Sequence, residues 1–149
     1  MGQSPSGINV TSNRTSESIE FHQGKSNFGE MMLETSSKWT TQLTKIVSPV
    51  AIIMSVRAPV GDVNLLIDRS IIIGRGLSSI RPYCSDIYYF YYLLSTKKKL
   101  LESIATGTTF KAINNKTLQE IILPIAPEKE QKRIVAVIEK MLLEICQFG

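Results

Sequence analysis

Hydrophobic residues in the first half of the chain occur in short β-branched runs. The segment between residues 46 and 74 contains "IVSPVAIIMSV", "VNLLI" and "SIIIG", which Pro, Gly, Asn or Asp residues separate. Short runs bounded by turn residues are typical of closely connected β-strands. The first forty residues are rich in Ser, Thr, Gly and Asn, with strand-like pieces such as "SIEFHQG" between them. We interpret this region as loops on a sheet edge.

Helical spacing takes over at residues 86–104, "DIYYFYYLLSTKKKLLESI", where apolar residues recur at helical intervals for about five turns. The aromatic residues at 88–92 surround nearly the whole circumference, so we expect this helix to pack on more than one side. After Gly107, the pattern predicts a strand in "TTFKAI", a short Asn-capped helix in "NKTLQEI" and a final strand in "IILPI".

The end of the chain predicts one long helix. Pro127 suits its first position, where the missing N–H costs nothing, and Glu128 and Glu130 follow where the helix dipole favours negative charge. An apolar seam then alternates in steps of three and four, the a/d pattern of a heptad repeat, at Gln131, Ile134, Ile138, Met141, Ile145 and Phe148. Such a seam packs against a partner helix or folds back onto its own domain, and periodicity leaves both alternatives open.

The length of the chain indicates how many domains it forms, and its charge distribution indicates what one of its surfaces could bind. With 149 residues, 43% of them hydrophobic, the chain can bury one core, so we expect one domain with a helical appendage. The formal net charge is +4, and residues 75–127 hold seven Lys and Arg against three Asp and Glu, whereas residues 1–74 and 128–149 are each balanced. A local cationic excess suits a surface that faces phosphates, but it is also common on an ordinary solvated surface.

The sequence argues against several kinds of chemistry. His22 is the only histidine, so no His-based triad or multi-histidine metal site can form, and we expect it at the surface or half-buried. Cys84 and Cys146 lack metal-binding spacing and are typical of reduced thiols in a cytoplasmic protein. No apolar run approaches the ~18 residues that cross a bilayer. We therefore expect a cytoplasmic protein with no catalytic residues, metal, cofactor or membrane partner.

Six fragments, taken in order, resemble one known family. They are "GQSPSG", "FHQGKSNFG", "SVRAPVGDVN", "IGRGLSSIRP", "GTTFKAINNKTLQEIILPIAP" and "EKEQKRIV". Their order and approximate spacing are similar to those of a target recognition domain from the specificity subunit of type I restriction-modification enzymes, over nearly the entire chain. The resemblance implies a mixed α/β (α+β) fold, with a twisted, largely antiparallel sheet, packed helices and a protruding C-terminal helix.

The same resemblance implies a division of the chain. In that family a full subunit carries two such domains related by approximate two-fold symmetry, and their exit helices pair into an antiparallel spacer. Residues 1–126 would then form the DNA target recognition domain, and residues 127–149 the start of the spacer and dimerisation helix. The chain begins at the "GQSP" segment and ends about halfway along a normal spacer helix. We therefore expect a half-subunit, a truncated gene product or a trimmed fragment.

Two functional hypotheses follow. The first is a non-catalytic module that recognises half of a double-stranded DNA target and directs the methyltransferase (modification) subunits, and through them the restriction subunit, to that site. The second is an assembly module with little DNA affinity of its own. In this alternative the seam mediates homodimerisation or docking through Ile134, Ile138, Met141 and Ile145.

The first hypothesis assigns Arg57 and Arg75 to the DNA. Arg57 and Asp62 lie around a Pro-Val-Gly turn that the resemblance places near the DNA-facing side. Arginine can bond a guanine edge in bidentate geometry. The alternative is an ion pair with Asp62 or Asp68 that only fixes the loop. The glycines of "IGRGLSSIRP" are interpreted as a structural turn, and Arg75 between them stays a candidate contact.

Further candidates are of the types that bind the sugar-phosphate backbone. Thr108, Thr109 and Lys111 follow a flexible glycine, and hydroxyls and cations commonly position a protein on phosphates. Lys25 has a similar claim, with a solvated loop residue as the alternative. The triple lysine at 97–99 lies late in the aromatic-rich segment, where cations favour a helix C-terminus, so we do not assign it to DNA.

Overall fold

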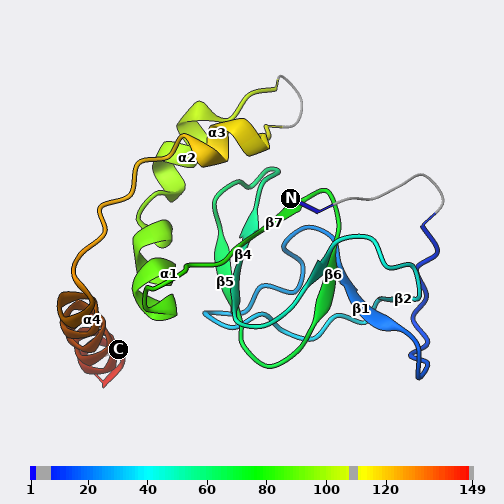
Figure 1. The fold of residues 1–149 in the computed structure, drawn as a ribbon, viewed down its shortest axis with the longest axis horizontal. Helices are drawn as coiled ribbons and strands as arrows, with labels where there is room; N and C mark the ends of the chain where they lie inside the picture. Colours follow the sequence, from blue (N-terminus) through cyan, green and yellow to red (C-terminus); the bar gives the residue numbers. More distant parts are fainter. Residues whose placement is uncertain (3–7, 108–110, 148–149) are drawn as a thin grey trace.

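The computed structural model describes residues 1–2, 8–107 and 111–147. Two β-sheets form the body of the domain, and helices cover one side of it (Figure 1). The four-stranded sheet contains, in order, β2 (Trp39–Thr40), β1 (Ile19–His22), β6 (Ile71–Ile73) and β3 (Ile46–Val47). The three-stranded sheet contains, in order, β5 (Val63–Leu66), β4 (Ala51–Ser55) and β7 (Leu77–Ile80).

The described helices follow the strands along the chain. They are α1 (Ile87–Ser95), α2 (Lys98–Ile104), α3 (Asn115–Gln119) and α4 (Glu128–Gln147). Helix α1 contacts β4 and β5 on one side and α4 on another, so the prediction that the aromatic-rich helix packs on more than one side is confirmed. In Figure 1, α4 is the outermost element, beyond α1.

Strand pairing confirms the predicted mixed fold with largely antiparallel sheets. Every pairing between the named strands is antiparallel except that of β1 with β6, which is parallel. The interpretation of the first forty residues as loops on a sheet edge is wrong for β1, which lies between β2 and β6. The physical reason is burial, because Phe21 and His22 are each 1% exposed and belong to an inner strand. Strand β7, which follows the glycines that we interpreted as a turn, pairs with β4.

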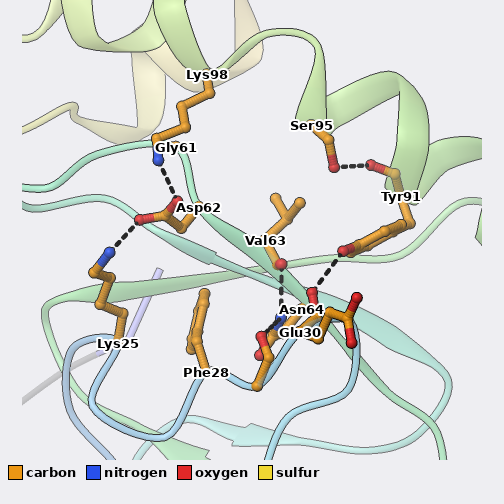
Figure 2. Close-up of a pocket in the computed structure, with 11 residues that line it drawn as sticks. Lys25, Phe28, Glu30, Gly61, Asp62, Val63, Asn64, Tyr91, Ser95 and Lys98 are labelled. Carbon is orange, nitrogen blue, oxygen red and sulfur yellow. Dashed lines mark hydrogen bonds and ion pairs between the residues drawn. The ribbon is translucent and has the colours of Figure 1, made fainter. Parts of the chain in front are cut away.

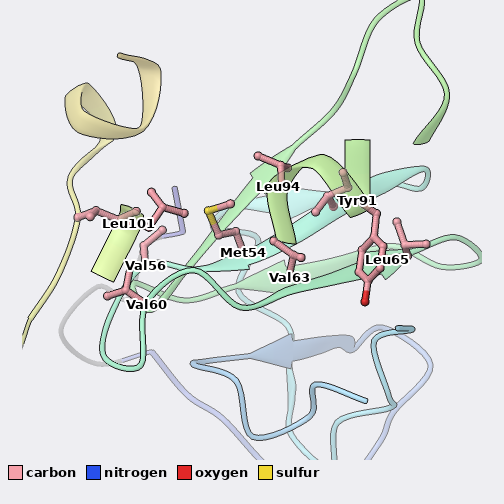
Figure 3. Close-up of a cluster of buried hydrophobic side chains, with 10 residues drawn as sticks. Met54, Val56, Val60, Val63, Leu65, Tyr91, Leu94 and Leu101 are labelled. Carbon is pink, nitrogen blue, oxygen red and sulfur yellow. The ribbon is translucent and has the colours of Figure 1, made fainter. Parts of the chain in front are cut away.

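The hydrophobic core lies on both faces of the three-stranded sheet. On β4, Ile52 and Met54 face a cluster shared with α1 and α2, and Ala51 and Ile53 face a second cluster shared with the four-stranded sheet. Figure 3 shows the first cluster, with Leu94 of α1 above Met54. A strand buried on both faces reads as a continuous apolar run, which explains why "AIIM" shows no alternation.

The single helix predicted over residues 86–104 is instead two. Asp86 begins α1, because its carboxylate accepts hydrogen bonds from the backbone N–H groups of Tyr88 and Tyr89. At its end the hydroxyls of Ser95 and Thr96 donate to backbone carbonyls one turn earlier, at 2.8 and 2.7 Å. Such bonds offer the backbone an alternative to continuing the helix. The chain then restarts as α2.

The segments after Gly107 agree only in part with the sequence pattern. Asn114 accepts a hydrogen bond from the Thr117 N–H at 2.8 Å and caps α3, as predicted. The strand predicted in "IILPI" is wrong, because residues 121–125 form no strand. This segment is held by side chains instead: Ile121 and Leu123 pack against the core cluster. Of the strand predicted in "TTFKAI", residues 108–110 lie outside the described residues, and Ala112 forms isolated bridges only.

Helix α4 packs onto its own domain at its start, which is one of the two alternatives that its seam left open, and the partner helix stays a prediction. It begins at Glu128, and the carbonyl of Pro127 accepts its first hydrogen bonds, so the proline lies one position before the first helical residue. Gln131 and Val135 are buried where α4 contacts α1. The second half of the helix exposes its apolar residues to solvent. None of the described helices combines the length and apolar character that a membrane span requires.

Candidate nucleic-acid interface

The backbone segments that carry Arg57 and Lys111 are hydrogen-bonded to each other, although 54 positions separate the two residues in sequence. Arg57 forms an antiparallel bridge with Ala112, and the backbone N–H of Ala58 donates to the Lys111 carbonyl at 2.9 Å. The N–H of Ile113 donates to the Val56 carbonyl at 3.0 Å. These backbone bonds join the two segments that carry the candidate cations, and both side chains are exposed.

Backbone contacts also bring the loops of Arg75 and Lys25 to this place. The N–H of Val56 donates to the Gly76 carbonyl at 2.9 Å. A Cβ added to Gly76 would lie 3.0 Å from the backbone nitrogen of Gly24, so only glycine lets these two loops approach so closely. The four segments that carry Lys25, Arg57, Arg75 and Lys111 are thus connected by direct backbone contacts. Thr108 and Thr109 lie outside the described residues.

Asp62 binds two lysines, and not Arg57 as the loop-fixing alternative required. Lys25 Nζ lies 2.7 Å from Asp62 Oδ2, and Lys98 Nζ lies 2.6 Å from Asp62 Oδ1 (Figure 2). Burial raises the pKa of the Asp62 carboxyl, but the hydrogen bonds from the two lysines outweigh this effect and hold the pKa below its ordinary value.

The loop-fixing alternative for Arg57 does not hold for the part of the chain that the structure describes. Asp68, the other acid considered there, pairs with Arg69 at 3.0 Å. Across residues 1–2, 8–107 and 111–147, no carboxylate forms an ion pair with Arg57. The Arg57 side chain is exposed.

Lys98 is a candidate that sequence reasoning missed. We had placed the triple lysine near a helix C-terminus, whereas the break after Thr96 makes Lys98 the first residue of α2. Gly61 allows the approach, since its φ is +90° and an added Cβ would lie 3.1 Å from the Lys98 Cα. The signal for this position was the pair of hydroxyl residues, Ser95 and Thr96, that ends α1.

The lysine–aspartate cluster borders a pocket of about 310 Å³ between the sheet and α1. Figure 2 shows Phe28 and Tyr91 among the residues that line it. The Tyr91 hydroxyl donates to the Glu30 carbonyl at 3.2 Å and so connects α1 to the loop after β1. This loop also carries Lys25, which means that α1 helps to position the candidate interface.

An ionic network around the buried Glu20 carboxylate supports the same loop, which follows β1. His22 Nε2 lies 2.6 Å from Glu20 Oε1, and Arg69 donates to both Glu20 oxygens at 2.8 and 3.2 Å. Arg69 also donates to the carbonyls of Leu33 and Glu34, both at 3.0 Å. The expectation that His22 lies at the surface or half-buried is wrong, because pairing with Glu20 allows an inner strand to hold it.

Electrostatics in this network favour the ionised carboxylate. Burial raises the pKa of Glu20, but its hydrogen-bond partners outweigh burial and lower the pKa from 4.5 to about 2. The hydrogen bond to Glu20 likewise raises the pKa of Arg69. The Glu20 carboxylate is 4% exposed and Arg69 is 27% exposed, so removing Arg69 would leave a buried negative charge with fewer partners.

The predicted oligomerisation residues fall into two groups. Ile134 and Ile138 are half-buried and lie in the first half of α4, the half that contacts α1. Met141 and Ile145 are 57% and 68% exposed. Leu142 and Leu143 are exposed as well, so the second half of α4 presents an apolar surface that the described chain does not cover.

The described residues show no group of three or more His, Cys, Asp or Glu residues that could hold a metal ion. Cys84 and Cys146 are both exposed and unpaired. The site is therefore characterised by exposed cations, one lysine–aspartate cluster and an apolar helix surface.

Comparison with known proteins identifies the family of this chain. The type I restriction modification DNA specificity domain model matches residues 19–146. A putative type I restriction enzyme MjaX specificity subunit from Methanocaldococcus jannaschii is 39% identical over 136 residues, which is 90% of this chain and 31% of the relative. The type I restriction enzyme MjaIX specificity subunit of the same organism is 31% identical over 90 residues, covering 58% of this chain and 21% of the relative.

Solved structures give the same result. The HsdS subunit from Thermoanaerobacter tengcongensis has a TM-score of 0.84 and 32% identity, over 99% of this chain and 35% of that one. A chain from work on complex assembly and conformational transition of the type I R-M system has a TM-score of 0.85 and 33% identity, over 99% of this chain and 36% of that one. The chain spans about a third of the length of these relatives. It belongs to the family of type I restriction modification DNA specificity domains.

Proposed function

We propose that this chain recognises one half of a double-stranded DNA target and carries out no chemistry itself. The observation that supports the proposal is that backbone contacts join the four segments that carry the exposed cations Lys25, Arg57, Arg75 and Lys111, in a member of a DNA specificity domain family. Phosphate contacts would supply most of the affinity, and a few base-edge contacts would supply the choice of sequence.

Arg57 and Lys111 have different roles in this proposal. Lys111 binds a phosphate, which positions the domain on the duplex without reading sequence. Arg57 is exposed and has no carboxylate partner among the described residues, so its guanidinium can form the bidentate contact that reads guanine. Arg75, Thr108 and Thr109 are further candidates for the backbone.

Residues 127–149 would act as the start of a spacer helix. The exposed apolar half of α4 supports this division, because Met141, Leu143 and Ile145 need a second helix to leave water. The partner is the equivalent helix of a second recognition domain or of a second copy of this chain. In the assembled enzyme, the domain and helix together would direct the methyltransferase subunits, and through them the restriction subunit, to the target in the cytoplasm.

The second candidate function is an assembly module with little DNA affinity of its own. The exposed apolar residues of α4 favour it, and DNA binding separates the two. Fluorescence anisotropy with a labelled duplex of random sequence, repeated from about 50 to 200 mM salt, should show that log K falls linearly with log salt concentration. No binding at the lowest salt, either alone or with the modification subunits, would leave only the assembly function.

Sequence choice needs a second experiment. Methylated sites mapped across the genome, with and without this gene and in the presence of its modification partner, should show one bipartite pattern that appears only with the gene. An unchanged methylation pattern would contradict the role in target recognition.

A further inference from the structure

Lys25, Asp62 and Lys98 form a compact three-residue cluster at the surface. One ammonium binds each carboxylate oxygen, at 2.7 Å for Lys25 and 2.6 Å for Lys98. The two lysine side chains are 42% exposed and the aspartate is 19% exposed, so the cations are accessible and the anion lies beneath them. The residues come from the loop after β1, the turn before β5 and the start of α2. The fold thus builds this cluster from three separate segments.

We propose that Lys25 and Lys98 form a binding site for one DNA phosphodiester group, and that Asp62 masks this site in the free protein. The inference rests on the proposed DNA recognition and adds Lys98 and Asp62 to it. Asp62 touches no DNA in this scheme. It is a positioning residue, and because it occupies the two lysines it weakens the binding of DNA whose sequence is unrelated to the target.

The chemistry of the two anions supports the exchange. A carboxylate and a phosphodiester each carry one negative charge on two equivalent oxygens, and each oxygen can accept a hydrogen bond from an ammonium group. Two ammonium groups that Asp62 holds on its two oxygens are therefore already placed for two phosphate oxygens. Lysine binds phosphate as a point charge, so no change of side-chain orientation comparable to that of an arginine fork is needed.

The exposure of the cluster keeps the exchange easy. The two lysine side chains are 42% exposed, and ion pairs of such exposed cations contribute little net stability, because water also solvates the ammonium groups. A phosphate that approaches from solvent can therefore replace the carboxylate, and Asp62, which is 19% exposed, keeps part of its solvation. A fully buried cluster would not allow this, because the abandoned aspartate would lose all solvation.

The residues that line the pocket favour binding of the phosphate at its rim, where the two lysines lie. Glu30 also lines this pocket, and Figure 2 shows it on the side away from the Asp62–Lys25 pair. An anion deep in the pocket would meet a second carboxylate, whereas one at the lysine rim meets only the masked pair. The cluster also adjoins the candidate interface, because Asp62 belongs to the turn that begins at Arg57 and Lys25 follows Gly24, which contacts Gly76.

The first test removes the mask. Asp62→Asn keeps the size of the side chain and removes its charge, so binding to a fluorescein-labelled 30-bp duplex of random sequence should tighten several-fold. Its salt slope should steepen by roughly one unit, as expected for one additional phosphate charge neutralised. The matched control is Asp68→Asn, which changes net charge equally but releases only Arg69, an arginine that Glu20 continues to hold. Equal effects of the two changes would overturn the masking while leaving DNA binding by the unaltered chain intact.

A second pair of variants tests the lysine without touching Asp62. Lys98→Gln should weaken binding to the same duplex and make the salt slope shallower by roughly one unit. Lys99→Gln, an equal charge change at the neighbouring exposed position of α2, should have a clearly smaller effect. Equal losses for Lys98→Gln and Lys99→Gln would reject the phosphate site, and this pair decides the matter if Asp62→Asn does not fold. If neither the unaltered chain nor Asp62→Asn binds the duplex in a salt-dependent way, the proposed function fails together with the inference.

Discussion

The side-chain carbonyl of Gln131 accepts a hydrogen bond from the backbone N–H of Asp86 at 2.9 Å. The same side chain donates to the carbonyl of Ala126 at 2.7 Å. One buried amide therefore joins the start of α1, the end of the segment between α3 and α4, and the first turn of α4. Tyr89 supports this joint, because its hydroxyl donates to the Pro124 carbonyl at 2.9 Å. The direction in which α4 leaves the domain is therefore fixed by polar contacts as well as by the burial of Val135.

Gln131→Ala should loosen the attachment of α4 to the start of α1. The substitution leaves the Asp86 N–H and the Ala126 carbonyl without their partner, and because both groups are only partly buried we expect the two losses together to cost about 1–3 kcal/mol. We expect urea unfolding to show a loss in that range and limited proteolysis to cut near residue 126 more rapidly. Gln119→Ala, at an exposed position of α3, should leave both measurements nearly unchanged. Unaltered stability and proteolysis of Gln131→Ala would show that Val135 alone holds the helix.

The apolar half of α4 should mediate association. Met141→Glu combined with Ile145→Glu places charge on the exposed surface, so light scattering should show a change from dimer to monomer, for the chain alone or with its modification partner. The circular dichroism spectrum should stay that of the folded domain, because neither residue is buried in it. Lys129→Glu, an exposed change near the helix start, should leave association intact. A monomer before and after the double substitution would contradict this interface.

The Glu20 network should make stability depend on acid pH. The pKa of folded Glu20 is about 2, below its ordinary value of 4.5, because its hydrogen-bond partners favour the charged form over the effect of burial. A lowered pKa stabilises the fold at pH values above 4.5, and the contribution disappears as the pH falls towards 2. The shift corresponds to a contribution on the order of 3 kcal/mol at neutral pH.

Glu20→Gln tests this dependence. The variant should be less stable than the unaltered chain at pH 7, and the difference in unfolding free energy should shrink steadily between about pH 4.5 and pH 2. Glu17→Gln serves as the control, since Glu17 is exposed and lies three residues earlier. A stability difference between Glu20→Gln and the unaltered chain that does not change with pH would exclude an ionised Glu20.

Sequence patterns predicted the elements whose signals are local. The short apolar strands around residue 50 and the cap at Asn114 follow from β-branched runs and from one side chain and its own backbone. The inner position of β1 could not be predicted, because it depends on His22 and Arg69 meeting Glu20, and Arg69 lies 49 positions away from that glutamate. Periodicity finds a buried apolar face, but it does not find a buried ion pair.

The candidate site shows the same limit. Lys25, Arg57, Arg75 and Lys111 were chosen for residue type and neighbouring glycines, and the structure brings their segments together through backbone bonds that sequence cannot display. Lys98 was missed because it depends on where α1 ends. The alternative of an Arg57–Asp62 ion pair does not hold for a similar reason: two lysines distant in sequence already occupy that carboxylate.

Arg57 and Lys111 offer the decisive comparison, because they are neighbours in space with different proposed contacts. Lys111→Ala should weaken binding to matched and mismatched DNA about equally and lower the salt slope by roughly one unit, since a phosphate contact carries no sequence information. Arg57→Ala should cost about 1–3 kcal/mol mainly on the matched half-site, because a bidentate base contact is lost there alone. Lys38→Ala, a control substitution at an exposed position next to β2, should change neither the affinity for the two duplexes nor the salt slope. Anisotropy titrations of the assembled complex on both duplexes measure all three, and equal profiles for Arg57→Ala and Lys111→Ala would refute the assignment of one residue to a base and the other to a phosphate.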